Sequence, residues 1–221
     1  SFEVKNGQTI AFVGHTGSGK SSIINLFMRF YEFDRGQILI DGQDIKDYSQ
    51  EALRKSIGLV LQEPFLYHGT IASNIRMYHE ELTDEDVRQV AAFVDVADFI
   101  ESLPGGYDHP VTERGSTLST GQRQLLAFAR TIAAQPKILI LDEATANIDQ
   151  ETEEMIQNSL KKMRQGRTTI AIAHRLSTIQ DADCIYVLDK GKIIESGNHD
   201  QLIALGGTYK KMYDLQTGMM K

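Results

Sequence analysis

Hydrophobic residues in this chain follow two alternating patterns, short apolar runs and longer stretches where they recur every three to four positions. Short runs predict buried strands, and recurrence at i, i+3 and i+4 predicts amphipathic helices. The expected strands are residues 8–13, 36–42, 57–61, 138–141 and 168–173. Buried strands separated by helices are typical of a parallel sheet that is covered on both faces, so the pattern predicts an α/β fold.

The remaining stretches predict the helices and one hairpin. A helix is expected from Ser22 onward, with an apolar face formed by Ile23, Ile24, Leu26, Phe27 and Phe30. Residues 65–134 are expected to be mostly helical, with a helix start at Thr83, a break at 104–106 and a further helix at 122–134. A terminal hairpin should turn at Lys190-Gly191, and two short helices should follow, at 200–205 and 208–217.

Composition narrows the class of protein. The chain has 221 residues, 41% of them hydrophobic, which is enough for a substantial core. Its net charge of −7 argues against a nucleic-acid-binding surface. The only cysteine, Cys184, lies in an apolar run and is expected in the core of a protein from a reducing compartment. No apolar stretch approaches the roughly 20 residues of a membrane span, so we expect a soluble, cytosolic domain.

One octet of the sequence carries the strongest chemical signal. It lies between a predicted strand and a predicted helix and consists of Gly14, His15, Thr16, Gly17, Ser18, Gly19, Lys20 and Ser21. Glycines let backbone N–H groups approach a polyphosphate closely, and a helix N-terminus adds its dipole. Lys20 supplies a charge for the outer phosphates, and Ser21 supplies a hydroxyl ligand for Mg²⁺. The octet predicts a phosphate-binding loop rather than a glycine-rich turn with a surface lysine.

Two further segments are candidates for the same chemistry. The run 138–141 delivers Asp142 and Glu143 at the carboxyl end of a strand, the edge at which open α/β sheets bind ligands. Asp142 is placed to hold Mg²⁺ through water, and Glu143 to polarise an attacking water. Ser119 is a natural N-cap for the helix that follows it, and this turn is a second candidate anion site. Taken alone, each segment is also compatible with an ordinary strand end or an ordinary capped helix.

These segments together resemble a known family. The whole chain is similar to the nucleotide-binding domain of an ABC transporter, of the exporter type, and its motifs occur in that family's order. Residues 14–21 resemble the Walker A loop, Gln62 the Q-loop glutamine, and 111–115 the exporter segment that touches the membrane domains' cytoplasmic loops. Residues 118–122 resemble the LSGGQ signature, 138–143 Walker B, 146–149 the D-loop, and His174 the switch histidine.

The resemblance implies a P-loop NTPase that hydrolyses ATP with Mg²⁺ and has four catalytic residues, Glu143, His174, Gln62 and Lys20. The implied ligands of ATP are the octet together with Ser22, Gln62, Asp142 and His174, and those of Mg²⁺ are Ser21, Gln62 and Asp142. Two such domains sandwich two ATP molecules in this family. The residues that would therefore contact the partner's ATP are Ser119, Thr120, Gly121 and Gln122.

The resemblance also implies an organisation and a setting. Residues 1–221 would form a single ATP-binding domain, with a RecA-like core at 1–64 and 132–221 and a helical signature subdomain at 65–131. Its partners would be a second nucleotide-binding domain and the cytoplasmic loops of a membrane exporter domain, expected in the same full-length chain, with no nucleic acid. We therefore expect a motor domain that couples ATP hydrolysis to export at the cytoplasmic face of the cell membrane.

The chain departs from the family pattern in the signature, at the adenine-stacking position and in the D-loop, where Ala146 and Asn147 replace the usual Ser-Ala. Thr120 stands where the signature usually has its first glycine, and a β-branched residue there should restrict the backbone and bring a Cβ near the phosphate. We interpret this as one half of a heterodimer; a tolerated variant in a homodimer is the alternative. No aromatic residue before Gly14 matches the family's adenine-stacking position, and Phe2 is expected to pack on the sheet. Part of the antiparallel β lobe is therefore expected to be missing from these residues.

Three other functions compete with the exporter interpretation. A soluble ABC ATPase acting on ribosomes or DNA shares most of these motifs, although the long insertions of the DNA-repair members are missing. A non-hydrolysing, nucleotide-gated clamp would not need Glu143 and His174. A P-loop kinase would have no use for residues 118–122.

Overall fold

The computed structural model describes residues 1–77, 79–112, 115–142, 150–173 and 175–218, and the chain divides into two compact units. Unit 1 comprises residues 1–57, 137–143 and 167–221, and unit 2 comprises residues 58–136 and 144–166. Each unit therefore combines segments that are far apart in the sequence, and each is described in turn below.

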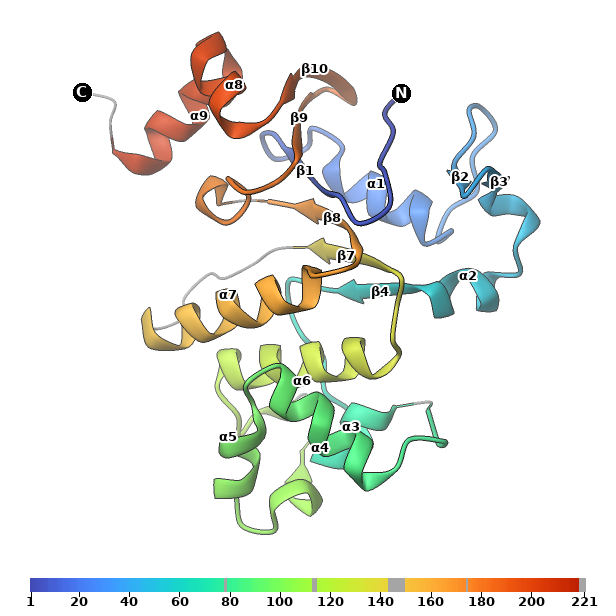
Figure 1. Ribbon diagram of the computed structural model, residues 1–221, viewed down its shortest axis with the longest axis vertical. Helices are drawn as coiled ribbons and strands as arrows, with labels where there is room; N and C mark the ends of the chain where they lie inside the picture. The colour runs from blue at the N-terminus through green and yellow to red at the C-terminus, as the bar shows by residue number, and fades with distance from the viewer. Residues whose placement is uncertain (78, 113–114, 143–149, 174, 219–221) are drawn as a thin grey trace. The chain divides into compact units, whose positions relative to one another are not determined.

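Unit 1 is built on a sheet in the order β10-β9-β1-β8-β7 (Figure 1). Strands β7, β8, β1 and β9 run parallel, and β10 closes the edge in antiparallel pairing with β9. The strands of the unit are β1 (Thr9–Val13), β2 (Leu39–Ile40), β3 (Gln43–Asp44), β7 (Ile138–Asp142), β8 (Thr168–Ile172), β9 (Cys184–Asp189) and β10 (Lys192–Gly197). Its α-helices are α1 (Lys20–Phe27), α2 (Gln50–Ser56), α8 (His199–Leu205) and α9 (Thr208–Thr217).

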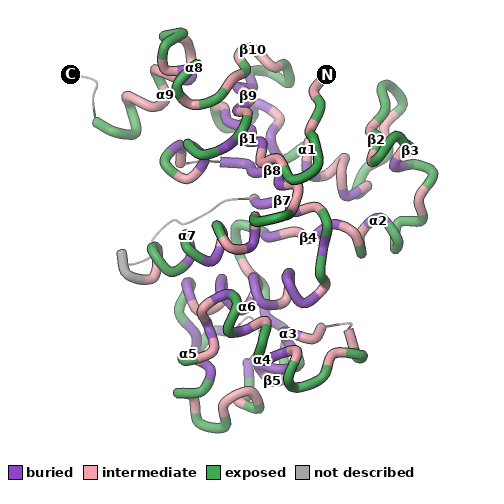
Figure 2. Tube along the Cα trace, in the orientation of Figure 1, coloured by how far each residue is buried: buried purple, intermediate pink, exposed green. Residues whose placement is uncertain are grey.

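The parallel strands are the core of unit 1. Ile10 to Val13 of β1 are at most 1% exposed, and the central residues of β7 and β8 are buried as well (Figure 2). The edge of Phe2 packs on Phe12, with 5.1 Å between the ring centroids, and Phe2 also lies 5.4 Å from the ring of Tyr186. The predicted α/β fold with a mainly parallel sheet is confirmed, and so is the expected packing of Phe2 on the sheet.

Unit 2 is helical and is organised around α6 (Thr120–Ala133), which contacts α3, α4 and α7. The predicted apolar face of α6 is confirmed, because Leu125, Leu126, Ala129 and Ile132 are all buried (Figure 2). The other helices are α3 (Ile71–Arg76), α4 (Asp84–Phe93), α5 (Ala97–Ser102) and α7 (Gln150–Arg164). The strands are β4 (Ile57–Val60), which begins at the last residue before the unit, β5 (Gly69–Thr70) and β6 (Pro110–Val111).

Helix ends follow the local chemistry of the sequence. Thr83 caps α4 in a reciprocal capping box with Asp86, and Ser119 does the same for α6 with Gln122. The predicted turn at Lys190-Gly191 is confirmed, with φ angles of 48° and 76°. The helices expected at the C-terminus are confirmed as α8 and α9.

Several expectations were wrong in detail. Phe30 lies beyond the end of α1 and is 49% exposed, because that helix stops at Phe27. Of the strand expected at 36–42, only Leu39–Ile40 pairs, with β3 across a turn at Asp41-Gly42. Cys184 is half-buried rather than in the core, since it begins β9 and shares the less buried face of that strand with Tyr186. Helices α2 and α7 were not anticipated.

The C-terminal helix α9 is capped from a distance, and this gives a first testable prediction. No side chain of its own caps it, but the Glu195 carboxylate accepts the N–H groups of Thr208 and Tyr209, the latter at 3.0 Å. A Cβ at Gly207 would lie 2.7 Å from Cδ of Glu195, so a glycine leaves room for this cap. Glu195→Ala should lower the free energy of unfolding by about 1–2 kcal/mol, as the loss of an N-cap does.

Urea unfolding followed by circular dichroism measures this change. Glu51→Ala is the matched control, since Glu51 is 79% exposed and pairs only with Lys55 of its own helix. That variant should change stability by no more than about 0.5 kcal/mol. Equal losses in the two variants would contradict the capping role of Glu195.

Candidate nucleotide site

The predicted phosphate loop connects β1 to α1 through three glycines with a positive φ, Gly14, Gly17 and Gly19. Gly14 has a φ of 154°, and a Cβ there would lie 2.7 Å from Ser18 Oγ and would clash with the carbonyl oxygen of Leu188. Gly19 has a φ of 106° and is the N-cap of α1, without any side chain bonded to the first N–H groups of the helix. The loop therefore leaves a helix N-terminus available to an anion.

Lys20 crosses back over this loop. Its side chain is buried, and Nζ donates to the carbonyl oxygens of Gly14 (2.7 Å) and His15 (3.1 Å). Burial lowers the pKa of this amine from its ordinary value, and the carboxylate of Asp142 opposes that shift only in part. A cation held in a glycine loop by carbonyl dipoles gains a full charge partner when a phosphate enters.

The hydroxyl of Ser18 gives an independent indication that the loop fits a polyphosphate. Ser18 is 4% exposed, and its Oγ has no hydrogen-bond partner among the described residues. A buried hydroxyl without a partner costs free energy, so such groups are found where a ligand or water completes them. Its position between Gly14 and Lys20 matches a loop that closes around phosphate oxygens.

Strand register explains why Asp142 belongs to the same site. Phe12 pairs with Ile172, and Ile172 pairs with Asp142, so the three residues lie level across three parallel strands. The phosphate loop begins two residues beyond Phe12, at the same carboxyl edge of the sheet. A hydroxyl at Ser21 and a carboxylate at Asp142 are hard oxygen donors of the kind that Mg²⁺ prefers.

The turn that follows β9, the strand next to β1, contacts the phosphate loop. Gly191 N–H donates to the carbonyl of Ser18 (2.9 Å), and a Cβ at Gly19 would lie 3.5 Å from Gly191 Cα. Because β9 pairs with β1 in register at Val13 and Val187, this support follows from the sheet itself. Sequence reasoning identified the turn but not this role, which needs the β1–β9 pairing.

Unit 2 brings together three of the predicted segments. Gly69 and Thr70, which follow Gln62, pair with Val111 and Pro110. Gly115 lies against Leu66, whose Cδ1 would be 2.9 Å from an ideal Cβ at this glycine. Gln62 itself is exposed in the loop after β4. The segment after Gln62, the segment 110–115 and the start of α6 are thus neighbours.

The signature residues are at the N-terminus of α6. Ser119 and Thr120 are exposed, Gly121 is buried, and Gln122 closes the capping box. Thr120 is the first residue of the helix and has no positive φ, so the expected backbone restriction causes no strain here. Arg123 donates to Thr120 Oγ1 (3.1 Å) and to the carbonyl of Leu118 (2.6 Å), which ties the threonine side chain to its own helix.

Several predicted residues lie outside the described part of the chain. These are Glu143, His174, the segment 146–149, and Glu113 and Arg114 of the segment 111–115. Their roles stay predictions. Conversely, Asn74, Arg123 and Arg130 were missed by sequence reasoning. An arginine at position 130, within a run that otherwise predicts a buried helix, is the signal that could have identified the last of them.

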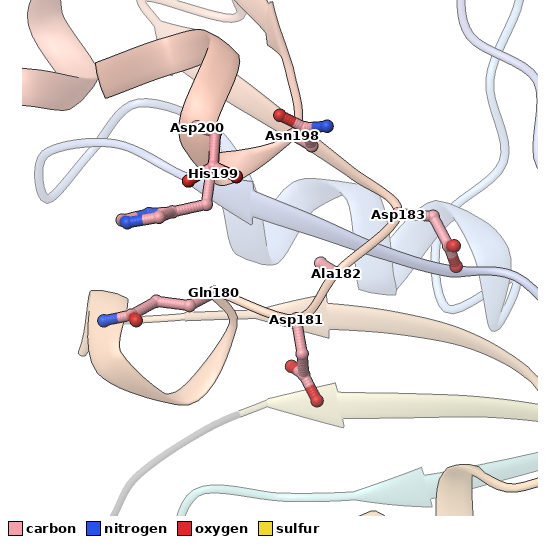
Figure 3. A pocket seen from close by; sticks show the side chains of 7 residues that line it. All are labelled: Gln180, Asp181, Ala182, Asp183, Asn198, His199 and Asp200. Carbon is pink, nitrogen blue, oxygen red and sulfur yellow. The ribbon is translucent and has the colours of Figure 1, made fainter. Parts of the chain in front are cut away.

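A hollow of about 540 Å³ in unit 1 lies elsewhere (Figure 3). Its acidic side chains are exposed, and the Asp183 carboxylate already accepts the N–H of Thr9 (2.7 Å). Asn198 caps α8, and His199 Nδ1 bonds the hydroxyl of Tyr209 (2.8 Å). The lining residues are Gln180, Asp181, Ala182, Asp183, Asn198, His199 and Asp200. These bonds engage the side chains in holding the start of β1, the N-terminus of α8 and its contact with α9, so we do not take this hollow as a candidate nucleotide site.

The geometry defines a P-loop nucleotide-binding protein, and comparison with known proteins gives the family. The model of the ABC transporter family matches residues 1–146. The chain belongs to the ABC transporter family. Domains of this family bind ATP and are in general ATPases. Among the residues that the structure describes, no helix is both long and apolar enough to cross a membrane.

Individual relatives are transporter components. The chain is 75% identical over 220 residues to the "Putative ABC transporter ATP-binding protein exp8" of Streptococcus pneumoniae serotype 4, covering all of this chain and 38% of that protein. It is 54% identical over 218 residues to the probable multidrug resistance ABC transporter ATP-binding/permease protein YheH of Bacillus subtilis, covering 99% of this chain and 32% of that protein.

A solved structure gives the same result. A bacterial Atm1-family ABC exporter with ATP bound superposes with a TM-score of 0.91 at 45% identity, over 97% of this chain and 38% of that one. The chain thus spans between 32% and 38% of the length of the relatives it matches. Their names describe an exporter, a probable multidrug resistance transporter and an ABC transporter ATP-binding protein, so the soluble ABC ATPase of the competing hypotheses is not favoured.

Gly14→Ala tests the phosphate loop. A Cβ would force either the Leu188 carbonyl or Ser18 to move, so the affinity for ATP should fall by about tenfold or more, which is at least 1.4 kcal/mol of binding free energy. Titration with ATP by calorimetry measures the loss.

Gly7→Ala is the matched control for that titration. Gly7 has a φ of 77° and nothing within 4 Å of an ideal Cβ. The Gly7→Ala variant should lose about 1 kcal/mol of stability and keep its affinity for ATP. Unchanged affinity in Gly14→Ala would show that the loop does not hold the nucleotide as inferred.

Proposed function

We propose that this chain is the ATP-hydrolysing motor domain of an exporter, converting ATP and water to ADP and phosphate. The observation that carries the proposal is the phosphate loop with its buried Lys20 at the same sheet edge as Asp142. In this reaction a protein contributes mainly positioning and charge stabilisation. Lys20 and the N–H groups at the start of α1 would neutralise the phosphates, and Ser21, Gln62 and Asp142 would hold Mg²⁺, which would supply further positive charge to them.

Glu143 is proposed as the general base and His174 as the residue that contacts the γ-phosphate. The support is their place in the sequence: Glu143 directly follows Asp142 at the end of β7, and His174 comes two residues after the end of β8. Carboxyl ends of parallel strands meet at one edge of the sheet, where ligands of open α/β sheets bind.

The larger assembly is part of the proposal. A second nucleotide-binding domain would complete the ATP site with its signature, and membrane segments of the same full-length protein would transmit the motion to substrate at the cytoplasmic face. Support comes from the relative named as an ATP-binding/permease protein and from the likeness to an exporter. Units 1 and 2 would then act as the core and the helical subdomain of a single ATP-binding domain.

Glu143→Gln tests the hydrolytic role. A positioned base typically contributes 10²–10⁴ in rate, so turnover should fall by about that factor while ATP binding is kept. Steady-state phosphate release and ATP titration measure the two properties separately. Glu154→Gln, an exposed position on α7, is the control and should leave both unchanged. Undiminished phosphate release in Glu143→Gln would refute the assignment.

Thr120 leads us to propose a heterodimer. A methyl-bearing side chain at this point of the signature would serve the partner's ATP less well than glycine, whereas Glu143 keeps this chain's own site competent. Mixing the chain with a candidate partner that carries a glycine there should raise ATPase activity several-fold over either domain alone. No rise on mixing, together with full activity of the chain by itself, would favour a homodimer.

A further inference from the structure

One face of α6 carries two arginines that donate hydrogen bonds to backbone carbonyl oxygens. Arg123 and Arg130 are about two turns apart and so lie on the same side of the helix. Arg123 holds the segment before the helix through the carbonyl of Leu118. Arg130 reaches to a different part of the chain, some 60 residues earlier, and its contacts are more extensive.

The guanidinium of Arg130 makes three hydrogen bonds across unit 2. Nη1 donates to the carbonyl of Phe65 (2.7 Å), Nε to the carbonyl of Asn74 (2.8 Å), and Nη2 to Oδ1 of Asn74 (2.8 Å). Its plane also lies over the ring of Tyr67, at 5.3 Å from the centroid. Only arginine offers several donors in one rigid fork, so lysine cannot reproduce this set.

Asn74 extends the cluster to the backbone on either side of Tyr67. It is 2% exposed, and its Nδ2 donates to the carbonyls of Tyr67 (2.8 Å) and Thr70 (3.0 Å). Its Oδ1 accepts the N–H of Tyr67 (2.8 Å) as well as the bond from Arg130. The amide thereby fastens residues 67–70 to α3, while Arg130 fastens Phe65 and α3 to α6.

Burial makes the centre of this cluster costly to disrupt. A buried polar group that loses one partner costs more than the bond was worth, and a partly buried charge costs more still. In the cluster, defined as Phe65, Tyr67, Asn74 and Arg130, this applies to Asn74 and Arg130, whereas the rings of Phe65 and Tyr67 are 43% and 45% exposed. Gln62 lies in an exposed loop, three residues before Phe65 of the cluster. The loop that carries Gln62 therefore ends at the cluster.

We propose that Arg130 is a positioning residue that joins the Gln62 loop to the signature helix α6. A displacement of Gln62 would then be transmitted through Phe65 and Arg130 to α6, whose first turn carries Ser119 and Thr120. This inference rests on the proposed function, in which Gln62 senses Mg²⁺ in one ATP site and the α6 N-terminus contacts another. The link itself needs no nucleotide to exist.

Hydrogen exchange followed by mass spectrometry tests the link in the absence of ATP. In Arg130→Lys, amides of residues 65–70 should exchange about tenfold faster or more. The segment would then open without first breaking the three hydrogen bonds of the Arg130 guanidinium, so opening costs less free energy. Arg76→Lys is the matched control: Arg76 also binds a backbone carbonyl of unit 2, that of Leu82 (2.9 Å), but not α6. It should leave exchange in 65–70 unchanged.

A second variant covers the case in which Arg130→Lys does not fold. Asn74→Asp keeps the acceptor for Arg130 but removes both donors to the Tyr67 and Thr70 carbonyls, so it should speed exchange in 65–70 as well. Unchanged exchange in the folded variants would overturn the inference. So would global unfolding of every variant without selective opening of 65–70, because the cluster would then be only structural.

Steady-state kinetics separates this inference from the proposed function. Arg130→Lys should lower kcat by about tenfold while the affinity for ATP changes less than twofold, since the phosphate loop belongs to unit 1. Absence of ATP hydrolysis in the unmodified protein would refute the proposed function, and the exchange result would still decide the link. Loss of ATP affinity equal to the loss of kcat would overturn the positioning role.

Discussion

The close approach of the phosphate loop to the end of β9 is the constraint on which the nucleotide site depends. The loop turns so tightly that the Leu188 carbonyl occupies the space where a side chain at Gly14 would lie. The N–H of Gly191 then bonds the carbonyl of Ser18, and Lys20 binds the carbonyls at the loop's start. Pairing of β1 with β9 thus helps to fix the shape of the loop, and a loop held in its binding shape lowers the ordering cost of binding.

Unit 2 depends on a different interaction, the use of arginine to satisfy carbonyls that no helix or strand satisfies. Loops that pack inside a unit leave such carbonyls without partners. Arg123 and Arg130 supply the donors from one face of α6, and Asn74 supplies more. The helix that carries the signature is therefore also the scaffold for the segments that precede it. In the proposed motor, a displacement of the segment after Gln62 would therefore be transmitted through α6 to the signature residues.

Much of the site could be predicted because its chemistry is local. The octet 14–21 specifies a strand, a glycine turn and a helix N-terminus within a few residues, and each follows from backbone sterics. The caps at Thr83 and Ser119 are likewise predictable, because each forms a capping box with the residue three positions later. Helix α7 was missed because its many charged residues hide the few that are buried, such as Ile156 and Met163. Phe30 was misplaced because helix ends depend on competing contacts beyond the periodic pattern.

The sequence by itself determined the class of fold, the phosphate loop and the order of the family's motifs, because these rest on periodicity and short-range geometry. Only the tertiary structure decided that Thr120 sits unstrained in a helix with its hydroxyl bonded to Arg123. It also decided that Arg130 meets Phe65 and Asn74, which are 65 and 56 residues away in the chain. Such contacts depend on how the elements pack in three dimensions. A local sequence pattern does not specify the distance between segments that are far apart in the chain.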